Sequence, residues 1–203
     1  GLAQVLLRLK QSDEALQLFT RAFDIYQAAY KDSHPRVAIA LSGIGLVALE
    51  RNQLDVAEDA FARSLRIYQG VYGARHSRIA SALMNLASLS IARDDSPAGE
   101  RFLRQAIEMF EATLPITHAT TAAARVRLGR FLITHQRYAE AEEQLIAARQ
   151  VLEQQPVPPI QSLQSATEAL AQVFEATKRP ELAQQARAHA TELASQRMST
   201  SPK

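Results

Sequence analysis

The sequence predicts an all-α fold, a right-handed α-solenoid of about five stacked helix-turn-helix repeats. Three observations support this prediction: a helix-forming composition, a strict internal period, and two apolar-periodic stretches inside each period. Seven glycines, eight prolines and no tryptophan accompany abundant Ala, Leu, Gln, Arg and Glu, and runs of β-branched residues are almost absent. Such a composition favours helices and gives little support to strands.

Composition also excludes several classes of protein. The 203 residues are 47% apolar, which is typical of a folded chain and not of a disordered one. The 23 basic and 21 acidic side chains are spread along the chain, so no nucleic-acid partner is expected. The absence of cysteine excludes disulfides, thiolate metal sites and a cysteine nucleophile. No apolar run approaches the roughly 18 residues that a membrane span needs, so no direct membrane contact is expected.

The internal period is 42 residues, with successive repeats starting at Arg36, Arg78, Thr120 and Ser162. It predicts repeats at residues 36–77, 78–119, 120–161 and 162–195, with residues 1–35 forming a repeat that is truncated at its start. Together these make a single predicted domain, residues 1–195. Residues 196–203 have no apolar periodicity and are predicted to be a flexible tail. Because the chain opens inside an apolar helical pattern, we expect it to be part of a longer protein.

Each repeat contains two helical stretches of about sixteen residues or more, separated by a polar break. The breaks are rich in capping residues and in proline near a helix start, and lie at residues 10–13, 51–53, 94–97, 135–137 and 178–180. Each repeat is therefore predicted to be a helical hairpin. A single hairpin cannot bury its apolar residues, so stacking is expected to form a continuous core with a concave and a convex face.

Small residues occupy one column of each helix. On the first helices these are Ala3, Gly45, Ala87, Gly129 and Ala171, and on the second helices Ala15, Ala57, Gly99, Ala141 and Ala183. Large apolar residues are expected to fill the space around them: Leu2, Ile44, Leu86, Leu128 and Leu170 on the first helices, and Phe19, Phe61, Leu103 and Leu145 on the second. The glycines around Ile44 are thus predicted to allow close helix packing, since no strand precedes them as a phosphate loop requires.

These small and aromatic positions resemble those of tetratricopeptide (TPR) repeats, and the 42-residue length resembles the kinesin-light-chain-like variety. The resemblance covers nearly the whole chain. Residues 30–35 and 72–77 are similar to the inter-repeat loop of that variety, and residues 84–87 to its first-helix signature. The last repeat departs from the pattern, because Arg187 replaces the second-helix aromatic and residues 156–159 replace the ordinary loop. Its polar second helix predicts a cap for an end without a neighbour.

The resemblance implies a protein–protein interaction module that binds a peptide or protein segment in its concave groove. An alternative is the regulatory or sensory C-terminal region of a bacterial serine/threonine kinase, which residues 170–183 resemble. Self-association through the first helix or an exposed repeat end is a third hypothesis. The expected compartment is the cytoplasm, or the periplasm if the parent protein is a membrane-spanning receptor kinase.

Positions 4, 8, 11 and 15 of each repeat lie on one face of its first helix, which TPR stacks present to the groove. The predicted ligand-binding residues are Leu46, Glu50, Ser81, Asn85, Ser88, Arg127 and Arg130. At position 8, Gly43 predicts a small-walled groove, and the resemblance implies that Asn85 bonds the backbone of an extended peptide. Arg127 and Arg130 offer fork-shaped donors for an acidic side chain, a phosphate or a C-terminal carboxylate.

No catalytic, metal or cofactor site is predicted. His34, His76 and His118 recur at the repeat period, but equivalent loops of successive hairpins are roughly 20 Å apart, whereas zinc ligands lie about 2 Å from one ion. These histidines are instead predicted to help start the helices that follow. The acidic pairs at residues 94–95 and 142–143 are predicted to act near helix N-termini. No serine-histidine-acid or kinase-type motif is present, so the chain is not predicted to be an enzyme.

Overall fold

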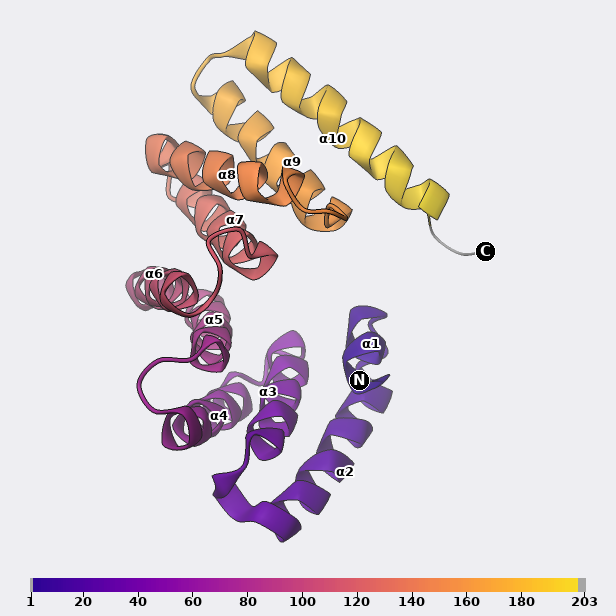
Figure 1. Ribbon diagram of the computed structural model, residues 1–203, viewed down its shortest axis with the longest axis vertical. Helices are drawn as coiled ribbons and strands as arrows, with labels where there is room; N and C mark the ends of the chain where they lie inside the picture. The colour runs from indigo at the N-terminus through magenta and orange to yellow at the C-terminus, as the bar shows by residue number, and fades with distance from the viewer. Residues whose placement is uncertain (1, 201–203) are drawn as a thin grey trace. The chain divides into compact units, whose positions relative to one another are not determined.

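Ten α-helices and one short 3-10 helix form residues 2–200, the part of the chain that the computed structural model describes (Figure 1). The first helices of the hairpins are α1 (Leu2–Arg8), α3 (Pro35–Glu50), α5 (Ser77–Ala92), α7 (Ala119–Thr134) and α9 (Ile160–Ala176). The second helices are α2 (Ser12–Tyr30), α4 (Leu54–Tyr72), α6 (Ser96–Thr113), α8 (Tyr138–Glu153) and α10 (Pro180–Thr200). No strand occurs in residues 2–200, and the predicted all-α fold of helical hairpins is confirmed.

The chain divides into an N-terminal unit, Gly1–Thr113, and a C-terminal unit, Leu114–Lys203. In the N-terminal unit α1 packs on α2, α3 on α4 and α5 on α6, while α2 contacts α3 and α4 contacts α5. In the C-terminal unit α7 packs on α8 and α9 on α10, and α8 contacts α9. The single domain over residues 1–195 stays a prediction. The predicted tail overlaps α10 as far as Thr200, and residues 201–203 lie outside the described part.

Every hairpin closes through the same backbone turn. The second residue after each first helix has a φ between 57° and 59°, and these five residues are Lys10, Asn52, Asp94, Gln136 and Lys178. The next N–H donates to a carbonyl five residues earlier, as from Gln53 to Ala48 at 2.8 Å. This Schellman arrangement satisfies carbonyls that the end of a helix leaves without a partner. The 42-residue period is therefore a property of the backbone as well as of the side chains.

Glycine in this turn is expected to stabilise the protein. A left-handed conformation costs a non-glycine residue roughly 1–2 kcal/mol, part of which glycine recovers. We expect Gln136→Gly to raise the free energy of unfolding by up to about 1 kcal/mol, measured by chemical denaturation. The control is Gln150→Gly on the exposed face of α8, where glycine in a helix should cost about 1 kcal/mol. A lower denaturation midpoint for Gln136→Gly would contradict the turn geometry.

The three periodic histidines cap the helices that follow them, as predicted. In each, Nδ1 accepts a hydrogen bond from the backbone N–H two residues later. The bonds join His34 to Arg36 at 3.1 Å, His76 to Arg78 at 3.0 Å, and His118 to Thr120 at 3.2 Å. The His76 ring also stacks on Tyr72, with 3.8 Å between ring centroids. Within residues 2–200, no group of three or more His, Asp or Glu side chains could hold a metal ion.

His76→Ala is expected to destabilise the N-terminal unit by about 0.5–2 kcal/mol, because it removes a side-chain acceptor at a helix start. His76→Asn should recover most of this loss, since the asparagine oxygen can accept the same N–H. Thermal unfolding of the two variants beside the parent protein measures the difference. Equal destabilisation by alanine and asparagine would show that stacking on Tyr72, and not capping, is the main role of the ring.

The small columns bring the two helices of a hairpin together as predicted. A Cβ on Gly45 would lie 2.5 Å from Phe61 Cε1, and one on Gly129 would lie 2.6 Å from Leu145 Cγ. The second-helix residues Phe19, Phe61, Leu103 and Leu145 are all buried. Leu2 was wrongly assigned to the core, because 66% of it is exposed. Its later equivalents Leu128 and Leu170 are buried, and for Leu170 the preceding helices α7 and α8 both contact α9.

Candidate functional site

Two of the predicted groove residues lie on α3 in the N-terminal unit. Leu46 is half-buried and packs against a cluster that includes Phe61 and Leu89, so it belongs partly to the core. Glu50 is exposed at the end of α3, where its carboxylate accepts a hydrogen bond of 2.7 Å from Ser12 Oγ at the start of α2. Glu50 therefore links two hairpins on the surface.

Three further predicted residues lie together on α5, spaced three and four residues apart on one face. The Ser81 and Ser88 hydroxyls donate to backbone carbonyls four residues earlier, at 3.1 Å and 3.0 Å. Asn85 lies between them and is half-buried, and among the described residues no hydrogen bond occupies its amide. An amide with both a donor and an acceptor suits the backbone of an extended peptide.

Gly43 does not form a groove wall, so the predicted small-walled groove is wrong at this position. Gly43 is buried, and a Cβ added to it would lie 2.3 Å from the Phe19 ring of α2. The phenyl ring of the preceding hairpin thus packs against α3 at Gly43. Asn85, one repeat later, is half-buried and keeps its side chain accessible.

Arg127 and Arg130 lie on α7 in the C-terminal unit, three residues apart and both exposed. The Arg130 guanidinium donates to Ser165 Oγ on α9 at 3.2 Å. Arg127 is exposed as a residue, yet desolvation by the surrounding protein lowers the pKa of its guanidinium. An arginine stays protonated even so. The two side chains therefore place two positive charges on one face of α7.

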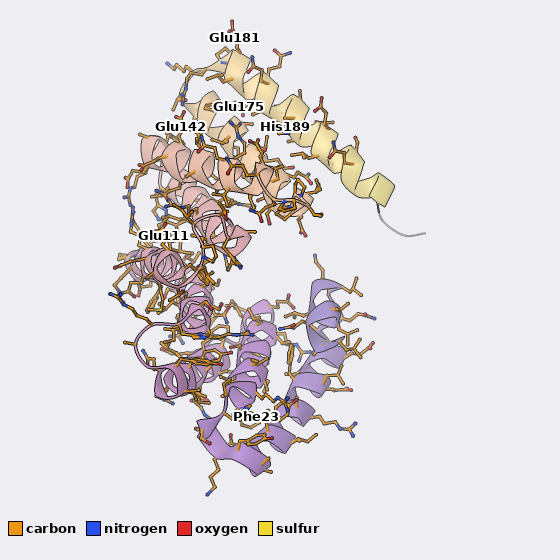
Figure 2. All side chains as sticks on the ribbon, in the orientation of Figure 1. Phe23, Glu111, Glu142, Glu175, Glu181 and His189 are labelled. Carbon is orange, nitrogen blue, oxygen red and sulfur yellow. The ribbon has the colours of Figure 1, made fainter. Side chains whose placement is uncertain are left out.

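One charged contact joins α8 to the turn between α9 and α10. The Arg179 guanidinium donates to both Glu142 carboxylate oxygens, at 2.9 Å and 2.5 Å, and the bond to Glu142 raises the pKa of Arg179 (Glu142 is labelled in Figure 2). Glu142 thus pairs between hairpins and does not act only on its own helix start. Asp95 keeps the predicted role, because its Oδ1 accepts the Ala98 N–H at 3.1 Å near the start of α6.

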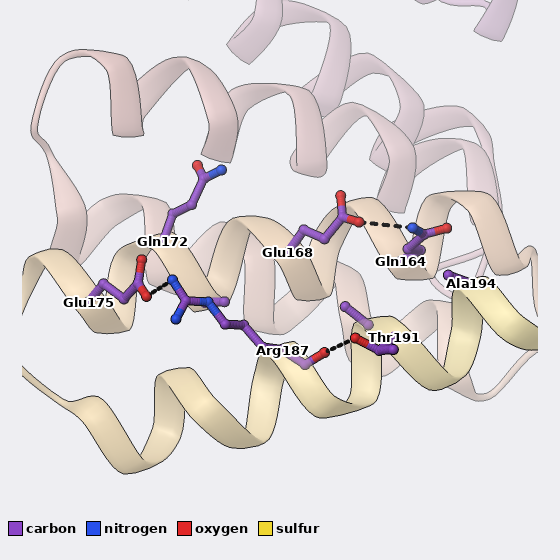
Figure 3. A pocket seen from close by; sticks show the side chains of 9 residues that line it. Gln164, Glu168, Gln172, Glu175, Arg187, Thr191 and Ala194 are labelled. Atoms are coloured by element: carbon purple, nitrogen blue, oxygen red, sulfur yellow. Dashed lines mark hydrogen bonds and ion pairs between the residues drawn. The ribbon is translucent and has the colours of Figure 1, made fainter.

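A recess of about 590 Å³ lies between α9 and α10 (Figure 3). Its wall includes an ion pair between Arg187 and Glu175, and a hydrogen bond of 2.8 Å from Gln164 to Glu168. Sequence reasoning missed this recess. The signal was available: one period earlier, the apolar residues Val126 and Leu145 stand in place of Glu168 and Arg187.

None of the helices in residues 2–200 is long and apolar enough to span a membrane. Residues 1–70 match a family model described as "Tetratricopeptide repeat". No curated protein matches the sequence.

Three solved structures resemble the chain along nearly its whole length. The crystal structure of BtubC (BKLC) from P. vanneervenii has 17% identity and a TM-score of 0.80, covering 100% of this chain and 80% of that one. The TPR-like repeats of a protein from Podosopora anserina described as a kinesin light chain have 18% identity and a TM-score of 0.71, covering 96% and 92%. The MamA protein has 16% identity and a TM-score of 0.57, covering 99% and 92%.

Proposed function

We propose that the chain, whose helical hairpins resemble the repeats of kinesin light chains, is a protein–protein interaction scaffold. The observation behind this proposal is the polar face of the first helices. In the part of the chain that the structure describes, no hydrogen bond occupies the Asn85 amide on α5, and α7 carries two exposed arginines. The amide fits a peptide or protein segment laid across α5, and the arginines fit one laid across α7, with no catalytic step.

The chemistry of the two surfaces suggests the chemistry of the ligand. The two α7 guanidinium groups favour an acidic side chain, a phosphate or a C-terminal carboxylate, because such anions accept paired N–H donors. The bond from Arg130 to Ser165 supports this, because it holds the Arg130 guanidinium on the surface between α7 and α9. Arg127 supplies the second guanidinium on the same face of α7. On α5, Asn85 would form a hydrogen bond with a backbone group of the peptide. It would therefore contribute affinity that does not depend on the side chains of the peptide.

Asn85→Ala is expected to weaken peptide binding about fivefold to tenfold, the effect of one hydrogen bond. The test screens the whole chain against an array of extended peptides with acidic residues or free C-termini, and then measures affinity by calorimetry. Gln69→Ala, which removes an exposed amide from the second helix α4, is the matched control. The proposal fails if the chain retains no peptide, or if both variants lose affinity equally.

The regulatory region of a bacterial kinase, the alternative from the sequence, receives no support from the family model or the related structures. Self-association has one supporting observation, the exposed apolar residues Leu2 and Val5 on α1 and Leu9 in the turn after it, which are 50–66% exposed. Light scattering across a range of protein concentrations separates the two roles. A monomeric mass at every protein concentration would contradict self-association and leave the scaffold role unaffected.

A further inference from the structure

The groove between the two helices of a hairpin is where the next helix packs. In the C-terminal unit α9 contacts both α7 and α8. In the N-terminal unit α3 likewise contacts α1 and α2, and α5 contacts α3 and α4. The corresponding groove between α9 and α10, here called the α9–α10 seam, has no further helix over it among the described residues. The recess of about 590 Å³ lies in this seam (Figure 3).

The α9–α10 seam keeps the geometry of a helix-binding groove but has different side chains. One repeat earlier, where α9 packs on α7 and α8, the apolar residues Val126, Leu145 and Leu152 are at most 5% exposed. In the seam the equivalent residues are Glu168, Arg187 and Ala194. The wall has therefore become polar and part of the floor has become smaller.

Exposure of the last hairpin to water would explain the polar residues Glu168 and Arg187 in the wall of the recess. It would not explain the small residue Ala194 in the floor. Long polar side chains alone would shield an uncovered hairpin, whereas Ala194, in place of Leu152 of the preceding hairpin, leaves the recess open between the helices. Ala171 and Ala190 are small in the preceding hairpin too, as Gly129 and Ala148. Small side chains permit the close approach of another helix, as the glycine and alanine columns do inside each hairpin.

The charges of the seam indicate which helix would fit. Figure 3 shows Glu175 paired with Arg187, so these two charges offset each other. Among the described residues, Glu168 has only the uncharged Gln164 amide as its hydrogen-bond partner, at 2.8 Å. The seam therefore keeps one net negative charge beside an alanine floor.

We propose that the α9–α10 seam binds an amphipathic helix of a partner protein. The helix would place small apolar side chains against Ala171, Ala190 and Ala194, and a lysine or arginine opposite Glu168. This site is separate from the peptide-binding faces of α5 and α7, so neither proposal depends on the other.

A model helix tests the proposal directly. The probe is a fluorescent amphipathic peptide of alanine, leucine and lysine with the length of α9, 17 residues, and its control is the same peptide with glutamate in place of lysine. Fluorescence anisotropy with the whole chain should show binding of the lysine peptide that weakens as salt rises. The glutamate peptide should bind at least about tenfold more weakly.

Two pairs of matched variants locate the site. Ala194→Arg places a long cation in the seam and should weaken probe binding about tenfold, whereas Ala188→Arg on the exposed side of α10 should change it less than about twofold. Glu168→Gln should weaken binding about threefold or more, and Glu181→Gln, at the exposed start of α10, should have little effect. Circular dichroism checks that each variant is folded, and the glutamine pair decides if Ala194→Arg is not.

Three results would overturn the proposal: equal affinity for the two peptides, no probe binding by the parent chain, or equal losses within a matched pair. A dimer of the parent chain that Ala194→Arg converts to a monomer would also overturn it, by assigning the seam to a second copy. Asn85→Ala should leave probe binding unchanged. Failure at the seam is thereby distinguished from failure of the peptide-binding proposal.

Discussion

Gly129→Leu is expected to destabilise the C-terminal unit by about 3 kcal/mol or more, because it overpacks the closest approach of α7 and α8. A Cβ alone would lie 2.6 Å from Leu145 Cγ and 2.8 Å from Cδ2. Leu145 is fully buried, so its side chain has no open space into which to move. The rest of the leucine side chain would have to push the two helices apart. Chemical and thermal denaturation measure the loss.

Gly70→Leu is the matched control for this substitution. Gly70 lies in α4 and is exposed, and a Cβ added there would meet no atom within 4 Å. Leucine is the better helix former by roughly 0.8 kcal/mol, so this variant should be as stable as the parent or slightly more so. If Gly129→Leu melted at the parent temperature, the packing of α7 on α8 through the small column would be wrong.

The hairpins were predictable because their apolar periodicity and their small columns are both local in sequence. Phe61 and Gly45 lie in one repeat and meet as the column predicts. The turns were less visible, since Lys10, Gln136 and Lys178 adopt a left-handed conformation that usually points to glycine. Leu2 was misassigned because a column reports similarity between repeats and not whether a neighbouring helix covers the residue.

The candidate site was predictable only as a helix face. The 3.6-residue periodicity predicts which residues share a face of α5 or of α7, but it does not say what crosses that face. At Gly43 a phenyl ring from the preceding hairpin does cross it. The bond between Glu142 and Arg179 joins residues 37 apart, and no local pattern indicates it. Such contacts depend on how one hairpin packs on the next.

Replacing both Arg127 and Arg130 with alanine is expected to weaken binding of an acidic peptide to the chain about tenfold or more. Both arginines are exposed in the free protein, and an ion pair that stays in water contributes only about 0–1 kcal/mol. A charge-assisted hydrogen bond that the ligand shields from water contributes about 1.5–3 kcal/mol. Two such donors on one face can hold a single carboxylate or phosphate, so the loss should exceed that of either single variant.

The double variant Arg66→Ala with Arg75→Ala is the control, because it removes the same charge from exposed positions outside the first-helix faces. It should lower affinity less than about twofold, since it changes only the long-range attraction between protein and ligand. Calorimetry at low and high salt distinguishes the two effects: loss of a direct contact persists at high salt, whereas long-range attraction is screened. Equal losses in the two double variants at low salt, both abolished at high salt, would mean that Arg127 and Arg130 do not form the binding site.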